Sequence, residues 1–204
     1  QGFPGTVARV VPGADPSSTA ITEVFEIPYE TTGAHSPRGM DIDKKGVVWL
    51  PLQSGHLAAF DRSKCTGQTN GPNATGKHCP EGWTMYKLPG PQMQNVASEG
   101  TAEAPYYTFV DQWDTLGMGE DLPLITGNAA DALHALKDGE MVTFRVPYPM
   151  GFFAKGLDGR IDDANAGWKG RGLWSTYGNR TPFHIEGGKG TLPDWGSMVE
   201  CIDE

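Results

Sequence analysis

Short stretches in which apolar and polar side chains alternate run along most of this chain, and they predict β-strands. Residues 141–146 alternate with a period of two, which is typical of a half-buried strand. Residues 37–43, 47–52, 56–61 and 83–88 form similar runs, separated by turn residues. We expect Trp49 to lie in the core of this unit. Four antiparallel strands in succession are what one blade of a β-propeller requires.

A short pattern recurs along the chain: an aromatic residue, a charged residue, a branched aliphatic residue and a proline. It occupies residues 25–28, 86–89 and 144–147, so its prolines, at positions 28, 89 and 147, lie 61 and then 58 residues apart. Proline cannot donate to a strand ladder and is therefore suited to the end of an edge strand. The near-equal spacing indicates an internal repeat.

The later repeats are less regular. Residues 122–127, 132–136 and 141–146 would be the last three strands of one repeat. Residues 129–137 could form a short helix by composition, but we favour a strand because a hairpin turn and a clear strand follow. A fourth, partial repeat begins at Phe152, and residues 172–176 resemble the strand around Trp49.

These patterns predict an all-β chain, a propeller segment of about three to four four-stranded antiparallel blades. We expect an N-terminal extended segment over residues 1–20, blades over 21–186 and a C-terminal tail over 187–204. The 28 glycines and 16 prolines leave little room for long helices. The formal charge of −9 argues against nucleic-acid binding, and no apolar run reaches the ~20 residues of a membrane span.

Three cysteines are present. Cys65 and Cys79 bracket a segment composed almost entirely of turn-forming residues, and we predict that a disulfide closes this loop. The alternative is two free thiols, as in a cytosolic protein; the spacing does not suit a metal site. A disulfide favours an extracytoplasmic location, either periplasmic or secreted. Cys201 has no evident partner.

The stretch from Ile21 to Asp61 resembles one blade of the streptogramin lyase-like (virginiamycin B lyase-like) propellers. The resemblance rests on the Pro-x-Gly motif at residues 36–39 and on Val48-Trp49, and it extends in part to about residue 185. Such propellers usually close with six or seven blades. The resemblance therefore implies that this chain needs further blades or partner chains to complete a ring.

The same resemblance implies a carbon–oxygen lyase that opens a lactone ring with a general-base histidine and Mg²⁺-binding glutamates. The matching positions here hold Arg38, Leu52 and Tyr177. Leucine cannot bind Mg²⁺, and arginine cannot act as a base near neutral pH. We therefore favour an extracytoplasmic binding or scaffold module that presents loops to a protein or small molecule. The alternative is a metal-dependent, lyase-like enzyme acting at the propeller channel.

Three groups of residues are candidates for such a site. His184 and Glu186, at i and i+2 on one strand face, are catalytic candidates that could hold a metal or pair an acid with a base, or form the polar face of an outer strand. Residues 158–167 are rich in oxygen ligands and suggest either a weak cation site or a solvated turn. We expect no definite cofactor, with Mg²⁺ and Ca²⁺ left open. The metal candidates are Asp158, Asp162, Asp163 and Asn165; the ligand-binding candidates are Arg38, Asp41, His56 and Phe152, with His56 alternatively on an exposed rim.

Overall fold

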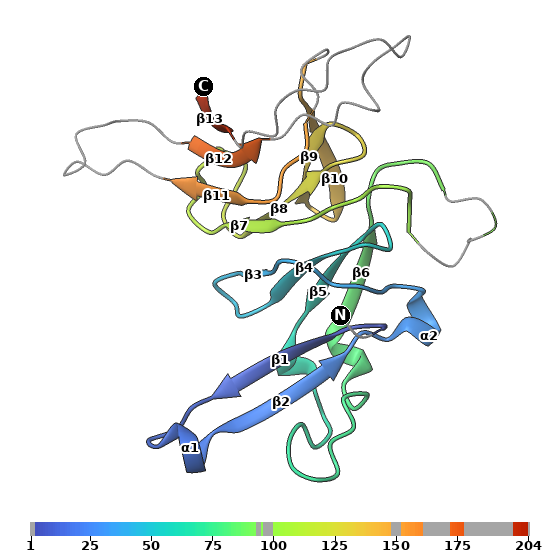
Figure 1. Cartoon of the computed structure of the whole chain (residues 1–204), viewed down its shortest axis with the longest axis vertical. Helices are drawn as coiled ribbons and strands as arrows, with labels where there is room; N and C mark the ends of the chain where they lie inside the picture. The colour runs from blue at the N-terminus through green and yellow to red at the C-terminus, as the bar shows by residue number, and fades with distance from the viewer. Residues whose placement is uncertain are drawn as a thin grey trace.

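The computed structural model describes residues 3–92, 95, 100–147, 152–160, 172–177 and 198–203. In this part of the chain, the strands form four antiparallel sheets (Figure 1). No helix among the described residues is long and apolar enough to cross a membrane. The elements are β1 (Thr6–Val11), α1 (Pro16–Thr19), β2 (Ile21–Glu26), α2 (Tyr29–Thr32), β3 (Asp41–Ile42), β4 (Val48–Leu52), β5 (His56–Phe60), β6 (Trp83–Lys87), β7 (Thr108–Asp111), β8 (Leu122–Gly127), β9 (Ala132–Lys137), β10 (Glu140–Arg145), β11 (Leu157–Arg160), β12 (Gly172–Tyr177) and β13 (Met198–Asp203), with 3₁₀ turns at Arg62–Lys64 and Pro80–Gly82.

The first complete blade has the strand order β3-β4-β5-β6, which confirms the predicted four-stranded unit. Its core is formed by apolar side chains from the middle strands, with Leu52, Ala58 and Phe60 almost fully buried. The predicted innermost strand over residues 37–43 is shorter than expected. Only Asp41–Ile42 pairs as a strand, and Pro37 forms a single bridge to Leu52. Pro37 has no N–H to donate, so it cannot extend a regular ladder.

The second complete blade has the order β7-β8-β9-β10. Its last three strands match the prediction, and residues 132–137 form a strand rather than a helix. The innermost strand, β7, was not predicted, because residues 106–111 show no clear alternation of apolar and polar side chains. Leu57 and Leu88 of the first blade pack against Ile125 and Leu136 of the second, joining the two blades.

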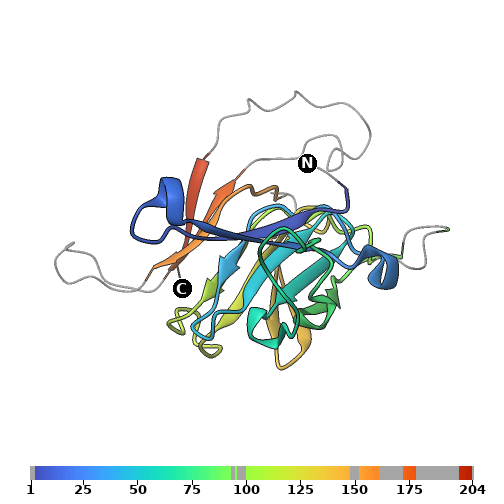
Figure 2. The same cartoon turned by 90° about the horizontal axis from the view of Figure 1, so that it is seen from below.

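Incomplete sheets flank the two blades. At one end, β1 and β2 form a hairpin that lies across the blades, as Figure 2 shows from that side. The predicted extended segment over residues 1–20 thus contains β1 and α1. At the other end, β11, β12 and β13 form a three-stranded sheet. Sheets of two and three strands beside blades of four are consistent with a partial β-propeller.

Trp49 is only half-buried, so its expected place in the blade core is wrong. The ring stacks beside Tyr86 at 6.1 Å between centroids, at the margin of the apolar contact between the two blades. Its indole N–H donates to Asp43 Oδ2 at 3.1 Å. The period of two in the sequence indicates on which face of the strand Trp49 lies. The neighbouring blade covers only part of that face, so the ring is only half-buried.

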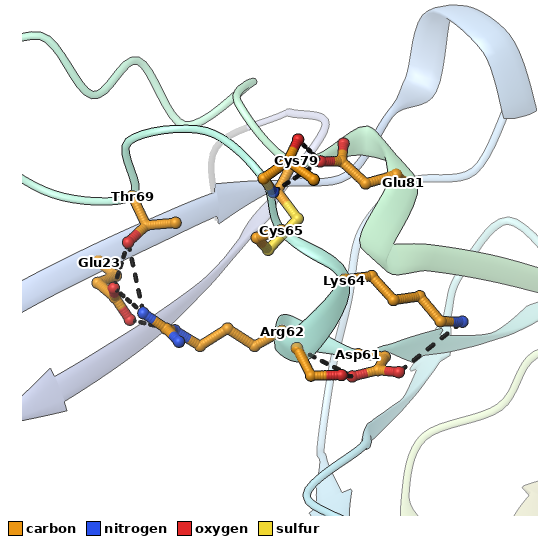
Figure 3. The surroundings of a disulfide bond; sticks show 10 residues. Glu23, Asp61, Arg62, Lys64, Cys65, Thr69, Cys79 and Glu81 are labelled. Atoms are coloured by element: carbon orange, nitrogen blue, oxygen red, sulfur yellow. Dashed lines mark hydrogen bonds and ion pairs between the residues drawn. A yellow bond between two sulfur atoms is a disulfide. The ribbon is translucent and has the colours of Figure 1, made fainter.

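The Cys65–Cys79 disulfide is present, as predicted, with the two Cα atoms 5.1 Å apart. Figure 3 shows that it closes a loop beside the N-terminal hairpin, where Arg62 and Thr69 both reach Glu23 of β2. Cys79 is buried in the same apolar cluster as Phe25 of β2. The disulfide-closed loop, residues 65–79, is therefore part of the contact between the hairpin and the first blade.

Candidate functional site

The innermost strands of three successive sheets lie next to one another. Figure 1 shows β3, β7 and β11 on the same side of the molecule, and β7 contacts both of the others. The residues that lead into these strands line an open cavity of about 520 Å³. Its described lining consists of Arg38 and Gly39 before β3, Tyr106 and Tyr107 before β7, and Lys155 before β11. Each of the three sheets thus contributes residues to one site, just before its innermost strand begins.

Arg38 is held by the backbone of the first blade. Its N–H donates to the carbonyl of Pro51 at 3.1 Å, next to the bridge between Pro37 and Leu52. Its guanidinium carbon lies 3.8 Å from the centre of the Tyr106 ring. At this distance the guanidinium stacks on the ring, an arrangement stabilised by cation–π attraction.

Tyr106 and Tyr107 are positioned by a buried hydroxyl. The N–H groups of both residues donate to Thr126 Oγ1, at 3.0 and 3.3 Å, and Thr126 is fully buried in β8. Gly39 donates its N–H to the carbonyl of Tyr106 at 3.3 Å. A Cβ atom at position 39 would lie only 2.9 Å from the Tyr107 ring, so a larger residue here would displace that ring.

Lys155 is positioned by hydrogen bonds on either side of it. The buried Asn128 side chain bonds both the N–H and the carbonyl of Ala154, at 2.9 and 3.0 Å. The N–H of Lys155 itself donates to Thr176 Oγ1 at 3.0 Å. Its Nζ lies 5.3 Å from the Tyr106 ring centre and 5.8 Å from that of Phe153. A second cation therefore approaches the same aromatic ring as Arg38.

The cavity is cationic. None of the described residues that line it is acidic, and no ion pair among the described residues involves Arg38 or Lys155. This local charge contrasts with the net charge of −9 for the whole chain. The arrangement can attract an anion and can stack a flat group against its aromatic walls.

Of the four ligand-binding candidates, only Arg38 lines this cavity. Asp41 Oδ2 accepts the N–H of Val110 at 2.7 Å, so this carboxylate joins β3 to β7. Phe152 is 3% exposed and packs in the apolar core of the second blade. His56 is 2% exposed, not on an exposed rim, and its Nδ1 lies 3.0 Å from Ser54 Oγ. The segment at Gly100–Thr101 packs over the preceding turn at Gly55.

Of the other predicted catalytic and metal-binding residues, only Asp158 lies in the described part of the chain. His184, Glu186, Asp162, Asp163 and Asn165 lie outside the described residues. Asp158 lies on β11 with an exposed side chain, and its Oδ1 accepts the N–H of Gly159 at 2.8 Å. Within the described ranges, no group of three or more His, Cys, Asp or Glu residues could hold a metal ion.

The structure instead reveals a buried acid–histidine pair that the sequence did not suggest. Glu103 Oε2 lies 3.2 Å from His134 Nε2, and both side chains are at most 1% exposed. Glu103 Oε1 accepts the N–H groups of Ala104 and Ala129, while His134 Nδ1 contacts Thr143 Oγ1 at 3.0 Å. Because solvent does not reach either group, the pair serves to hold the segment before β7 against β9.

The fold is similar to solved structures of virginiamycin B lyase from Staphylococcus aureus. A catalytically inactive variant with quinupristin has a TM-score of 0.52 and 15% identity, covering 85% of this chain and 42% of that one. A selenomethionine-substituted form has a TM-score of 0.50 and 13% identity, with coverages of 87% and 46%. This chain therefore spans less than half the length of those lyases. No protein-family model matches the sequence, and neither does any curated protein. At this level of identity the comparison shows the fold alone: the chain has the β-propeller architecture of virginiamycin B lyase.

Proposed function

We propose that this protein is an extracytoplasmic β-propeller binding module that presents the cavity at Arg38, Tyr106 and Lys155 to a small-molecule ligand. One observation carries the proposal: three sheets each place a side chain at this cavity, and hydrogen bonds hold the backbone at or next to each of these residues. A site held in place before the ligand arrives loses less conformational entropy on binding. The disulfide supports the extracytoplasmic location, because such bonds persist in oxidising compartments.

A metal-dependent, lyase-like enzyme remains the alternative function. Such chemistry needs a base and oxygen ligands that hold Mg²⁺. The described lining of the cavity supplies two cationic side chains and two tyrosines, with no carboxylate or histidine. Positive side chains repel a divalent cation, so the observed lining favours binding over metal-assisted catalysis.

The proposal can be tested by titrating the protein with small aromatic compounds of different charge: phenylacetate, phenyl phosphate, benzyl alcohol and benzylamine. We expect at least one to bind, as measured by isothermal titration calorimetry, and we expect Tyr106→Ala to abolish that binding. Trp113→Ala is the matched control, because Trp113 is an exposed aromatic residue beside Lys44, not at the cavity. The proposal fails if no compound binds, or if Tyr106→Ala binds like the wild type while its circular dichroism is unchanged.

A further inference from the structure

We infer that the cavity selects small molecules that carry an oxyanion next to a planar apolar group, of which an aromatic carboxylate is the simplest case. This inference rests on the proposed function, since it assumes that the cavity binds a ligand. It goes further by assigning the chemical class of that ligand from the two cations and their surroundings.

The orientation of Arg38 leaves its hydrogen-bonding edge available. One face of the guanidinium stacks on Tyr106, with its central carbon 3.8 Å from the ring centre. No described residue accepts a hydrogen bond from its side-chain N–H groups. A guanidinium presents these donors in a planar fork that matches the two oxygens of a carboxylate. Contact with the ring restricts the movement of the guanidinium and thus reduces the entropy lost when an anion binds.

Lys155 adds a second positive charge at the same ring. Its Nζ and the guanidinium carbon of Arg38 lie 5.3 and 3.8 Å from one centroid, so these two atoms are at most 9.1 Å apart. Two like charges within about 10 Å still repel each other at moderate salt. An anion that contacts both would relieve this repulsion, and the described lining offers no acidic side chain to do so. An anionic group on the ligand would supply the negative charge that the described lining lacks.

The surroundings also restrict the rest of the ligand. Tyr107 is 40% exposed, and the Phe153 ring lies edge-on to Tyr106 at 5.8 Å, so aromatic surface adjoins the cations. Such surface favours a flat apolar group beside the anion. The net charge of −9 disfavours a long polyanion, whose distant charges the rest of the surface would repel. A small aromatic oxyanion fits both conditions.

The experiment compares four probes of similar size: phenylacetate, phenyl phosphate, benzyl alcohol and benzylamine. We expect phenylacetate or phenyl phosphate to bind at least about tenfold more tightly than benzyl alcohol, since a charged hydrogen bond contributes that much. The comparison between the two anions distinguishes a carboxylate from a phosphate. Affinity should fall as salt is added, because salt screens the attraction. Benzylamine should not bind.

Variants then test which residues are responsible for the preference for anions. Arg38→Gln and Lys155→Gln should each weaken anion binding by about tenfold and leave benzyl alcohol binding unchanged. Arg38→Lys keeps the charge but loses the planar fork. Its affinity for the anion should therefore lie between those of Arg38→Gln and the wild type. Lys87→Gln is the matched control, because it removes the same charge from the outermost strand β6. Thermal unfolding of each variant checks that the fold is intact.

The outcomes separate this inference from the proposed function. If benzyl alcohol or benzylamine binds as tightly as the tighter of the two anions, and Tyr106→Ala abolishes that binding, the cavity is a ligand site but not an oxyanion site. The inference is also overturned if Arg38→Gln and Lys155→Gln both bind that anion as well as Lys87→Gln does. If none of the four probes binds, the proposed function itself is contradicted.

Discussion

At the scale of single residues, Glu23 joins parts of the chain that are distant in sequence. It lies on β2 with a side chain that is 1% exposed. Arg62 donates to both carboxylate oxygens and Thr69 donates its hydroxyl to Oε1 (Figure 3). Arg9 donates to Oε2 at 3.0 Å. The Arg62 hydrogen bonds, joined by those of Thr69 and Arg9, outweigh desolvation and lower the pKa of Glu23 to about 2.

We expect Glu23→Gln to reduce the free energy of unfolding by about 3 kcal/mol at neutral pH, because it breaks a buried, hydrogen-bonded ion pair. The pKa of Glu23 falls on folding from 4.5 to about 2, so its charged form stabilises the folded state above pH 4.5. This stabilisation is lost as the pH decreases toward 2. Urea unfolding at several pH values should therefore show the two proteins converging in acid. Glu30→Gln, at an exposed glutamate, is the control. If the free energies of unfolding of the two proteins differ by the same amount at all pH values, the stabilisation does not come from the charged form of Glu23.

At the scale of elements, the disulfide-closed loop attaches the outer edge of the N-terminal hairpin. The carbonyl of Gly76 accepts the N–H of Glu26 at 2.8 Å, continuing the hydrogen bonding of β2. Lys77 Nζ lies 3.2 Å from Glu26 and 2.7 Å from Glu30. A loop made of turn residues has few apolar contacts of its own, so the covalent bond limits the conformations that it samples.

Replacing both Cys65 and Cys79 with serine should lower the free energy of unfolding by about 3 kcal/mol, because the bridge closes a loop with a sequence separation of 14. The amide of Glu26 should exchange its hydrogen faster, while amides in β8 should not change at low denaturant. Hydrogen exchange with mass spectrometry checks both regions. Reductant should reproduce the effect in the wild type and do nothing to the double variant. Unchanged exchange at Glu26 would show that the loop holds its place without the bond.

At the scale of the whole molecule, the sheets at the two ends are incomplete compared with the blades between them. Among the described residues, β1 pairs with β2 alone. The hairpin also exposes apolar side chains: Val10 is 59% exposed, Ile21 46% and Val24 39%. Val10 and Val24 lie on one face, because their cross-strand partners are Thr22 and Ala8. An unpaired edge beside an apolar face is suited to further strands, as in a closed propeller.

We expect the isolated chain to self-associate as its concentration increases, and Val10→Lys to reduce this association. A lysine on the exposed face opposes contact between apolar surfaces and adds charge next to the free edge. Sedimentation velocity over a range of concentrations measures the effect. Trp113→Lys serves as the control, because it changes an equally exposed residue away from the hairpin. If the wild type sediments as a monomer throughout, this surface does not drive association.

The strands of the two blades could be predicted from the sequence because their signals are local. The period of two and the turn residues identify β4, β5, β8 and β9, and the turn-rich segment between two cysteines indicates the disulfide. The short β3 and the unpredicted β7 are innermost strands, where bridges and contacts between blades replace a regular alternating pattern. The local sequence pattern therefore predicts the outer strands of each blade better than the innermost strand.

The candidate site could not be predicted in this way. Arg38 was singled out by its place in a motif, but Tyr106 and Lys155 join it only because successive sheets align their first strands. The pairing of Glu103 with His134 likewise depends on packing between distant segments. A strand pattern determines on which face a side chain lies, but the neighbouring blade determines whether that face is buried. The sequence by itself determined the strands and the disulfide, and the tertiary structure alone decided which residues meet at the cavity.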